Sequence, residues 1–171
     1  MLRIVLLVAL FFGLTSSALA APPSMFGGFF NKSSVTKASL TVTSPRVRTV
    51  TGPVAITVDL TTQEMTVASD GRTIYTFDVS TGRKGYTTPT GNYRPIRMHK
   101  MWYSSKYENS PMPYSIFFHG GYAIHGTGDL KNLGQVASHG CVRLHPDNAE
   151  KLFNLVNQVG MKNTKISLIR S

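Results

Sequence analysis

Hydrophobic and polar residues alternate along much of the second part of the chain, which is typical of half-buried β-strands. In the first such segment, 54–60, valine, isoleucine and leucine occupy every second position. Two further segments, 65–68 and 73–79, flank the dipeptide Asp70-Gly71, which favours a tight hairpin turn. The three segments therefore predict an antiparallel meander.

The strand pattern continues to the end of the chain, with breaks rich in Gly, Pro, Ser and Thr. The expected segments are a loop over 80–91, strands over 92–103 (interrupted by Pro95), 114–118, 122–124 and 164–169, and a hairpin turn at His119-Gly120-Gly121. On this scheme His125 lies just after a strand.

Only one segment has a helical spacing of apolar residues. From Leu152 to Val159 they recur at i, i+3, i+4 and i+7. We expect Asp147 to cap the start of this helix, with Glu150 in capping-box spacing, and Gly160 to end it. Many short strands and one helix predict a mostly-β domain over 53–170.

The first part of the chain has a different composition. Residues 1–20 combine a basic start, a short apolar stretch and the small-x-small pattern Ala18-Leu19-Ala20, which together predict a cleaved signal peptide. A retained membrane anchor is the alternative, but the apolar stretch is shorter than the roughly 20 residues that a spanning helix needs. Residues 21–52 predict a flexible linker, with at most a short edge strand at 40–43.

The chain is strongly basic, with a formal net charge of +10. The mature protein keeps one positive charge fewer, because Arg3 lies in the predicted signal peptide. Export argues against nucleic acid as the partner, so cell-wall polymers and anionic lipid head groups are the polyanions to consider. The alternative is that the charge serves only solubility.

Cys141 is the only cysteine of the chain. In an oxidising compartment a single cysteine is buried and inert, paired between chains, or a free reactive thiol. Its neighbours favour the last, because two histidines, His125 and His139, are candidates to take the thiol proton and hold a thiolate–imidazolium pair. The sequence alone does not choose between the two bases.

Two residues beside the cysteine suggest further roles. Gly140 allows the backbone to approach a substrate closely and to direct peptide N–H groups at a developing oxyanion. Arg143, two residues past the cysteine, can hold a substrate carboxylate with its guanidinium.

Other interpretations of these and neighbouring residues stay open. A zinc site built from His125, His139, Cys141 and His145 has the right number of ligands. The aromatic residues Trp102, Tyr103 and Tyr107 fit core packing better than a substrate groove. Asp129 is expected to be a solvated loop residue rather than a third catalytic group. The chain as a whole could also be a wall-binding module that has lost turnover.

The segment His125-Gly126-Thr127, followed after a short interval by Ser138-His139-Gly140-Cys141-Val142-Arg143-Leu144, resembles the signature of the YkuD-type L,D-transpeptidase domain. The upstream stretch Thr88-Pro89-Thr90-Gly91-Asn92-Tyr93 resembles another recurring part of that family. The resemblance covers roughly residues 53–170 and implies a sandwich-like or barrel-like β-fold with the cysteine and histidine at one end.

The resemblance implies a role for each matching residue. Cys141 corresponds to the nucleophile and His125 to the general base, oriented by the backbone carbonyl of Gly126. His139, Gly140 and Cys141 correspond to the segment whose peptide N–H groups form the oxyanion hole. Arg143 and Ser138 are assigned to substrate binding, although some members carry Asn at the position of Arg143.

The implied reaction begins with a peptidoglycan stem tetrapeptide as acyl donor. The cysteine attacks the carbonyl between diaminopimelate and the terminal D-alanine, D-alanine leaves, and a thioester forms. A second diaminopimelate amine then gives a 3-3 crosslink. The alternatives are water, which gives an L,D-carboxypeptidase, and a lipoprotein lysine, which gives an anchoring enzyme. No cofactor or metal is expected, and the protein is expected to act as a monomer in the periplasm or cell wall.

Overall fold

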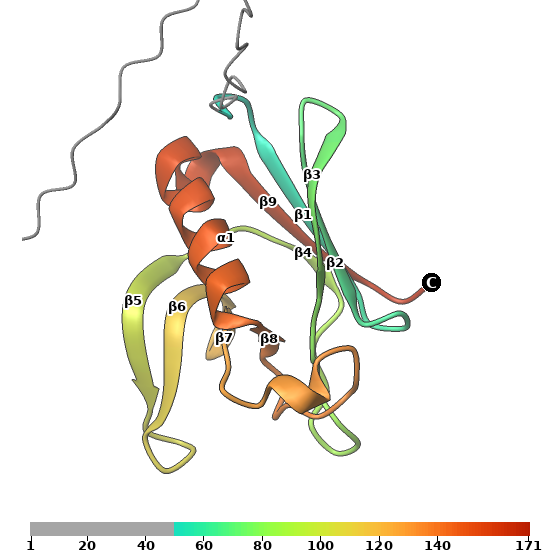
Figure 1. The fold of residues 1–171 in the computed structure, drawn as a ribbon, viewed down its shortest axis with the longest axis vertical. Coiled ribbons are helices and arrows are strands. Elements are labelled where there is room, and N and C mark those ends of the chain that lie inside the picture. The colour runs from blue at the N-terminus through green and yellow to red at the C-terminus, as the bar shows by residue number, and fades with distance from the viewer. Residues whose placement is uncertain (1–49) are drawn as a thin grey trace, which may run out of the picture. The chain divides into compact units, whose positions relative to one another are not determined.

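The alternating segments form two β-sheets, and the helical segment packs beside them (Figure 1). The computed structural model describes residues 50–171. The strands are β1 (Val54–Asp59), β2 (Glu64–Ser69), β3 (Arg72–Asp78), β4 (Gly91–Tyr93), β5 (Arg97–Ser104), β6 (Ser110–His119), β7 (Tyr122–Gly126), β8 (Val142–Leu144) and β9 (Thr164–Ile169). The helix is α1 (Pro146–Val159), and single 3-10 turns lie at η1 (Leu130–Asn132) and η2 (Met161–Asn163). The prediction of a mostly-β fold is confirmed.

The first sheet contains the predicted meander, with the strand order β3-β2-β1-β9-β4. Asp70 and Gly71 both have positive φ angles, 50° and 72°, as a type I′ hairpin turn between β2 and β3 requires. The C-terminal strand β9 pairs in parallel with β1, so that Ile56 lies beside Ile166. This pairing joins the two ends of the described chain within one sheet.

The second sheet has the order β5-β6-β7-β8. It contains the predicted hairpin around His119-Gly120-Gly121, formed by β6 and β7. The strand predicted over 92–103 divides into two: β4 is an edge of the first sheet and β5 an edge of the second. Pro95 lies between them, where the chain changes sheets, because proline donates no hydrogen bond to a strand ladder.

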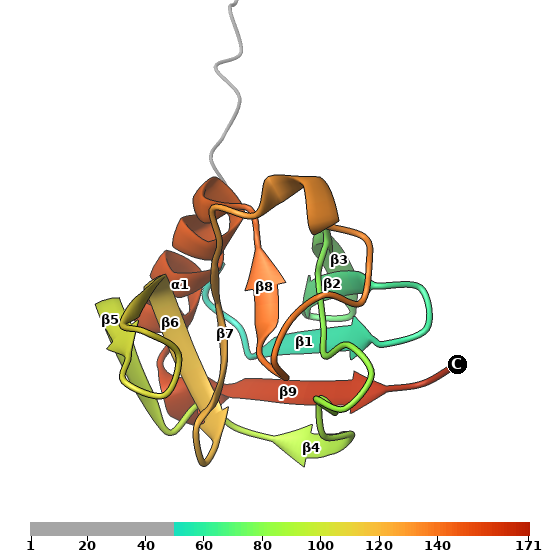
Figure 2. The same ribbon diagram turned by 90° about the horizontal axis from the view of Figure 1, so that it is seen from below.

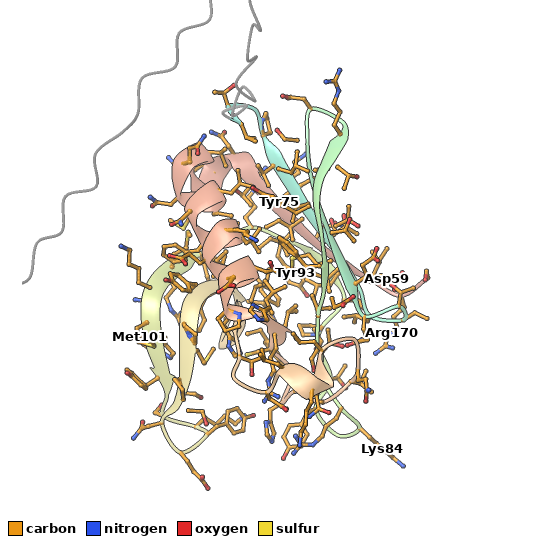
Figure 3. The ribbon with its side chains drawn as sticks, viewed as in Figure 1. Asp59, Tyr75, Lys84, Tyr93, Met101 and Arg170 are labelled. Carbon is orange, nitrogen blue, oxygen red and sulfur yellow. The ribbon has the colours of Figure 1, made fainter. Side chains whose placement is uncertain are left out.

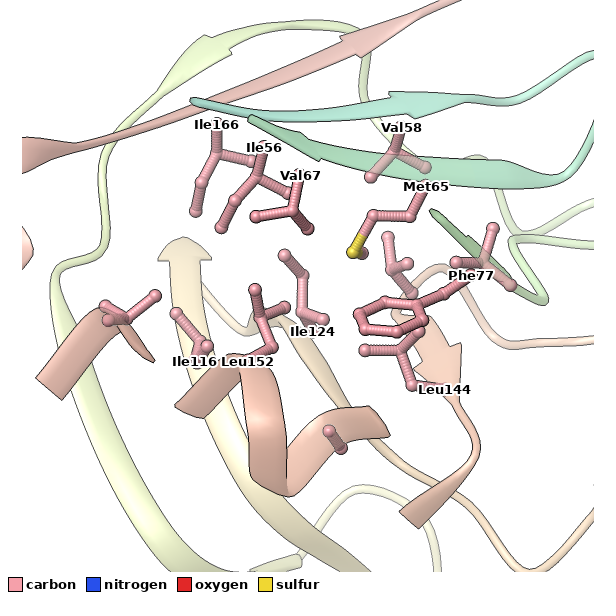
Figure 4. Packing of buried hydrophobic residues seen from close by; sticks show 14 of the residues in the cluster. Ile56, Val58, Met65, Val67, Phe77, Ile116, Ile124, Leu144, Leu152 and Ile166 are labelled. Atoms are coloured by element: carbon pink, nitrogen blue, oxygen red, sulfur yellow. The ribbon is translucent and has the colours of Figure 1, made fainter. Parts of the chain in front are cut away.

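The hydrophobic core lies between the first sheet and a layer made by β6, β7, β8 and α1 (Figure 4). The alternation of β1 places Val54, Ile56 and Val58 in this core, each at most 1% exposed. Leu152 of the helix and Leu144 of β8 meet them from the other side and are fully buried. The core thereby attaches β8, and the residues just before it, to the rest of the domain.

The start of the helix differs from the prediction. His145, not Asp147, is the N-cap: its Nδ1 accepts a hydrogen bond from the Asp147 N–H at 3.3 Å. Pro146 takes the first helical position, where a missing N–H leaves no bond unmade. Asp147 lies in the first turn, where its carboxylate faces the positive end of the helix dipole. Gly160 ends the helix with a φ of 89°, as predicted.

The predicted signal peptide, most of the linker and the short strand at 40–43 lie outside the described residues. The last residues of the predicted linker are described, and Val50 packs against the core and accepts a hydrogen bond from Gln158 Nε2 at 2.7 Å. Within residues 50–171, no helix has the length and apolar character needed to cross a bilayer.

Candidate active site

A cleft of about 500 Å³ opens where β7 and β8 pair in parallel, beside the β5–β6 hairpin. Figure 2 shows β8 next to β7, with loops reaching both strands. In their register His125 lies beside Arg143, and Cys141 precedes Arg143 by two residues. Side chains two residues apart on an extended segment point to the same side. Accordingly His125, Cys141 and Arg143 all line the cleft. His125 itself lies inside β7, not after it as the sequence predicted.

His125 is buried and oriented by the backbone. Its side chain is 6% exposed, and Nδ1 lies 2.7 Å from the carbonyl oxygen of Gly126. A carbonyl only accepts, so Nδ1 carries the proton and Nε2 keeps its lone pair. The pKa of His125 is lowered to about 4, mainly by burial; the bond to Gly126 opposes this, and the positive charge of Arg143 acts in the same direction as burial. The imidazole is therefore neutral at physiological pH and able to accept a proton at Nε2.

Cys141 is half-buried on the same wall of the cleft. Its Sγ makes a weak contact with the carbonyl oxygen of Gly121 at 3.9 Å. Burial raises the pKa of the thiol, and a backbone hydrogen bond with Ala123 and the charge of Arg143 offset this only in part. The expectation of a resting thiolate–imidazolium pair is therefore wrong: burial disfavours both charged forms, so the thiol and imidazole are neutral before substrate binds.

The depressed pKa of His125 predicts a loss of stability in acid. An unfolded histidine has a pKa near 6.5, so below that pH the unfolded chain binds a proton that the folded chain refuses until about pH 4. The free energy of unfolding should fall by about 3 kcal/mol between pH 6.5 and pH 4 from this residue. Denaturant unfolding of wild type and His125→Gln across this range tests the prediction. The free energy of unfolding of the variant should fall less steeply as the pH is lowered, because the variant lacks the contribution of His125. Parallel curves for the two proteins would contradict the prediction.

The turn before Cys141 depends on Gly140 and Ser138. Gly140 has a φ of 108°, and a Cβ added there would lie 2.7 Å from Cε1 of Tyr122. Ser138 is fully buried, donates to the carbonyl of Cys141 at 2.6 Å, and accepts from the Gly140 N–H at 2.9 Å. Its hydroxyl thus holds the turn and lies outside the cleft lining, which favours a positioning role over the expected substrate contact.

Thr88 supports the same turn from the 80–90 loop. Its Oγ1 donates to the Gly140 carbonyl at 2.8 Å and accepts from the Gly82 N–H at 2.8 Å. Thr88 begins the stretch that resembles the family, but its sequence context predicts no role for it. The contact joins residues 52 positions apart, so only the fold reveals it.

His139 is held by its ring and by one of its nitrogens. The ring stacks on Tyr107 and meets the edge of Tyr86, each at a centroid distance of 4.6 Å. Arg83 Nη2 lies 2.7 Å from its Nε2 and can only donate, so Nε2 is the acceptor. Partial burial, followed by the charges of Arg83 and other cations, lowers the pKa of His139. With Nε2 occupied, His139 is a poor base for the thiol, and the geometry favours His125.

The loop that carries Arg83 is bonded to the turn before the cysteine at Arg83 and exposed to solvent at Lys84. The backbone of Arg83 donates to Ser138 O at 3.0 Å, which ties the loop to the turn before the cysteine. Lys84, next to it, extends away from the protein (Figure 3). The loop therefore places the guanidinium of Arg83 against His139, which lines the cleft, and leaves Lys84 at the surface.

Arg143 already has a protein partner in the cleft. Its Nη1 lies 3.5 Å from Oδ2 of Asp129, which the sequence predicts to be a solvated loop residue. Asp129 lines the cleft and its side chain is 34% exposed, so it belongs to the site. The backbone of Arg143 is fixed by two hydrogen bonds with Ser80, at 2.8 and 3.0 Å.

The far wall of the cleft comes from the β5–β6 hairpin. Trp102 and Tyr107 line it, and Trp102 is 37% exposed, so the expectation that the aromatic cluster belongs to the core is wrong. Tyr103 is 57% exposed and lies outside the core as well. Arg97 stacks its guanidinium 3.8 Å from the ring centre of Phe117, also in the cleft. No sequence signal pointed to Arg97, because its place depends on hairpin pairing.

The zinc alternative finds no support in the geometry. Among residues 50–171, no three His, Cys, Asp or Glu side chains lie together in a way that could hold a metal ion. His145 caps the helix instead.

Comparison with known proteins gives consistent similarities. The sequence model of the YkuD family, described as the L,D-transpeptidase catalytic domain, matches residues 53–166. YkuD of Bacillus subtilis (strain 168), whose name describes it as a candidate L,D-transpeptidase, is 26% identical over 148 residues, covering 83% of this chain and 80% of that protein.

Solved structures share the fold. An L,D-transpeptidase from Stackebrandtia nassauensis is 27% identical, with a TM-score of 0.61, over 78% of this chain and 61% of that one. A second, from Xylanimonas cellulosilytica, is 28% identical, with a TM-score of 0.59, over 71% and 62%. The present chain thus spans about three fifths of the length of these solved relatives.

Proposed function

Because the chain belongs to the L,D-transpeptidase catalytic domain family, we propose that it is an exported cysteine L,D-transpeptidase acting on peptidoglycan stem peptides. The observation that carries the proposal is the arrangement of one cleft wall. A neutral, buried histidine, oriented by Gly126, lines the same cleft as the chain's only cysteine. Export rests on the predicted signal peptide.

In the first half-reaction, His125 Nε2 takes the thiol proton as Cys141 Sγ attacks the carbonyl that links diaminopimelate to the terminal D-alanine. The resulting imidazolium returns the proton to the leaving nitrogen, the C–N bond breaks, and D-alanine departs. A thioester on Cys141 remains. Proton transfer at the moment of attack suits a site in which burial keeps both partners neutral at rest.

The oxyanion formed during attack needs hydrogen-bond donors that are free. The Gly140 N–H already donates to Ser138 Oγ. We therefore assign the oxyanion to the peptide N–H groups of Cys141 and His139, on either side of that glycine. The Ser138 and Thr88 hydroxyls act on the geometry of this turn, not on the substrate.

In the second half-reaction, an amine or water attacks the thioester and the C–S bond breaks. A diaminopimelate amine gives a 3-3 crosslink, water gives the carboxypeptidase product, and a lipoprotein lysine gives an anchored lipoprotein. We favour the crosslink, because a mature chain near +9 would concentrate on anionic wall polymer, where acceptor amines are abundant.

The deciding experiment is incubation of the purified mature chain with a disaccharide-tetrapeptide, followed by mass spectrometry. A dimer joined from diaminopimelate to diaminopimelate, together with released D-alanine, is expected. Tripeptide alone would identify an L,D-carboxypeptidase, and a product on a lipoprotein lysine an anchoring enzyme. No release of D-alanine would favour the wall-binding module.

Arg143 gives a more specific prediction. In Arg143→Ala the kcat/KM for a tetrapeptide ending in a free carboxylate should fall about tenfold more than for the same peptide ending in an amide, because only the carboxylate can pair with the guanidinium. Steady-state release of the terminal residue from both peptides measures it. Arg72→Ala, an exposed arginine on β3, is the control. An equal loss for both peptides would count against the carboxylate contact.

A further inference from the structure

Asp129 stands out among the groups that line the cleft. Of the described residues in that lining it is the only acid, whereas Arg97, Lys106 and Arg143 are cations. A cleft that takes anionic stem peptides has no obvious use for a carboxylate, because that charge would repel the substrate. Its presence beside Arg143 calls for a positively charged ligand group.

The carboxylate is held in place independently of Arg143. Asn132 Nδ2 donates to both of its oxygens, at 2.9 and 2.8 Å, and the Asp129 N–H donates to Thr127 Oγ1 at 3.1 Å. Arg143 is similarly fixed through its backbone, by Ser80. The two charged groups are therefore positioned from separate elements and meet across the cleft wall.

Their mutual contact is loose. The separation of 3.5 Å exceeds the roughly 2.7–2.9 Å of a strong charge-assisted hydrogen bond. Both side chains are also partly exposed, at 20% and 34%, and such pairs contribute little to stability. A ligand that offers one group to each residue can therefore open the pair at small cost.

We propose that Asp129 and Arg143 form a subsite for the α-amino acid group whose nitrogen leaves or attacks at Cys141. Arg143 binds the carboxylate of that group, and Asp129 binds its ammonium. The proposal rests on the proposed function and specifies the acceptor class: an amine that carries a carboxylate on the same carbon.

The chemistry of the two half-reactions supports the assignment. The departing D-alanine and the amino-acid end of diaminopimelate share one arrangement, a nitrogen and a carboxylate on one carbon. Because the acceptor nitrogen attacks where the leaving nitrogen departed, one subsite serves both. Arg143 lies two residues from Cys141 and in register with His125, next to that position.

The proton and bond changes balance without another reactant. The acceptor ammonium docks on Asp129 and gives up one proton to solvent, which leaves a neutral amine at the thioester. The C–N bond forms and the C–S bond breaks. The attacking nitrogen loses a second proton to His125. His125 passes this proton to the departing sulfur of Cys141, which restores the thiol and the neutral imidazole. A lysine side chain or water can use only part of this subsite.

The test measures how the acyl-enzyme divides between amine and water. The mature chain is acylated with tetrapeptide in the presence of meso-diaminopimelate or of pentane-1,5-diamine, which is the same molecule without its carboxylates. Mass spectrometry gives the ratio of transfer product to tripeptide. This ratio is a property of the acyl-enzyme and does not depend on how fast it forms.

Asp129→Asn, which keeps the shape of the side chain, should lower the ratio about tenfold for both amines, because both lose the ammonium contact. Arg143→Gln should instead remove the preference for diaminopimelate over the diamine. Asp129→Glu should recover part of the loss. If Asp129 only positioned Arg143, Asp129→Asn would leave the diamine ratio unchanged.

Asp78→Asn, an exposed aspartate on β3, is the matched control and should keep the wild-type ratios. Wild-type ratios with both amines in Asp129→Asn, alongside normal thioester formation, would overturn this inference and leave the proposed function intact. Absence of any thioester on the wild-type chain would instead overturn the proposed function, and the inference with it.

Discussion

Replacing Cys141 by serine is expected to reduce release of D-alanine from tetrapeptide by about 10⁴-fold or more. The serine hydroxyl is a far weaker nucleophile than a thiol at neutral pH. The change removes no large apolar group from the core, because Cys141 is only half-buried at its edge. The variant should therefore unfold within about 1 kcal/mol of wild type. Chromatographic assay of D-alanine and denaturant unfolding of the same samples measure both effects.

His125→Ala should cost nearly as much activity, because the neutral thiol then has no proton acceptor. His125 is buried, so the alanine variant also leaves a cavity; His125→Gln fills that space and separates the loss of the base from the loss of packing. The double variant with Cys141→Ser should be little worse than either single one, since the pair acts as a unit. Additive losses, or full activity in any of these variants, would contradict the assigned roles.

His139→Ala should cost less activity than His125→Ala, because its proposed contribution is a backbone N–H.

Gly140→Ala is the second change expected to have a large effect, with an activity loss of about 10²-fold or more. Its φ of 108° lies in a region that side-chain-bearing residues rarely adopt, and the new Cβ would lie 2.7 Å from the Tyr122 ring. Either the turn or the Tyr122 side chain must shift to relieve this contact, and the strained φ favours a shift of the turn. That shift would move Cys141 and the proposed oxyanion donors, and displacements near 1 Å can cost about 10²-fold in rate.

Gly134→Ala is the matched control for backbone strain. Gly134 also has a positive φ, 82°, but nothing lies within 4 Å of a Cβ added there. Both variants should lose about 1–2 kcal/mol of stability from the strained backbone, and only Gly140→Ala should lose its activity. Comparable activity in the two variants would show that the approach to Tyr122 does not matter. Crystal structures of both variants would then show how the Gly140→Ala protein accommodates the new Cβ beside Tyr122.

The strands could be predicted because their signal is local. Alternation in 54–60 and the Asp70-Gly71 turn depend only on neighbouring residues, and both are confirmed. The pairing of β9 with β1 could not be predicted, because parallel pairing between the two ends of a domain leaves no mark on either segment. The predicted helix cap was wrong. Asp147 matched the spacing of a capping box, but Pro146 favours the first helical position, so the cap is the preceding residue, His145.

The sequence by itself determined the cysteine, its two candidate bases and the family, since these are properties of one short motif and its spacing. Only the tertiary structure distinguished the bases: His125 is buried and its Nδ1 is bonded to Gly126, which leaves the lone pair on Nε2, whereas Nε2 of His139 is held by Arg83. Burial also decided the protonation of the site, because desolvation depends on everything packed around a group and not on its neighbours in sequence. For the same reason the sequence predicted Asp129 as a solvated loop residue, and only the fold showed it as the partner of Arg143.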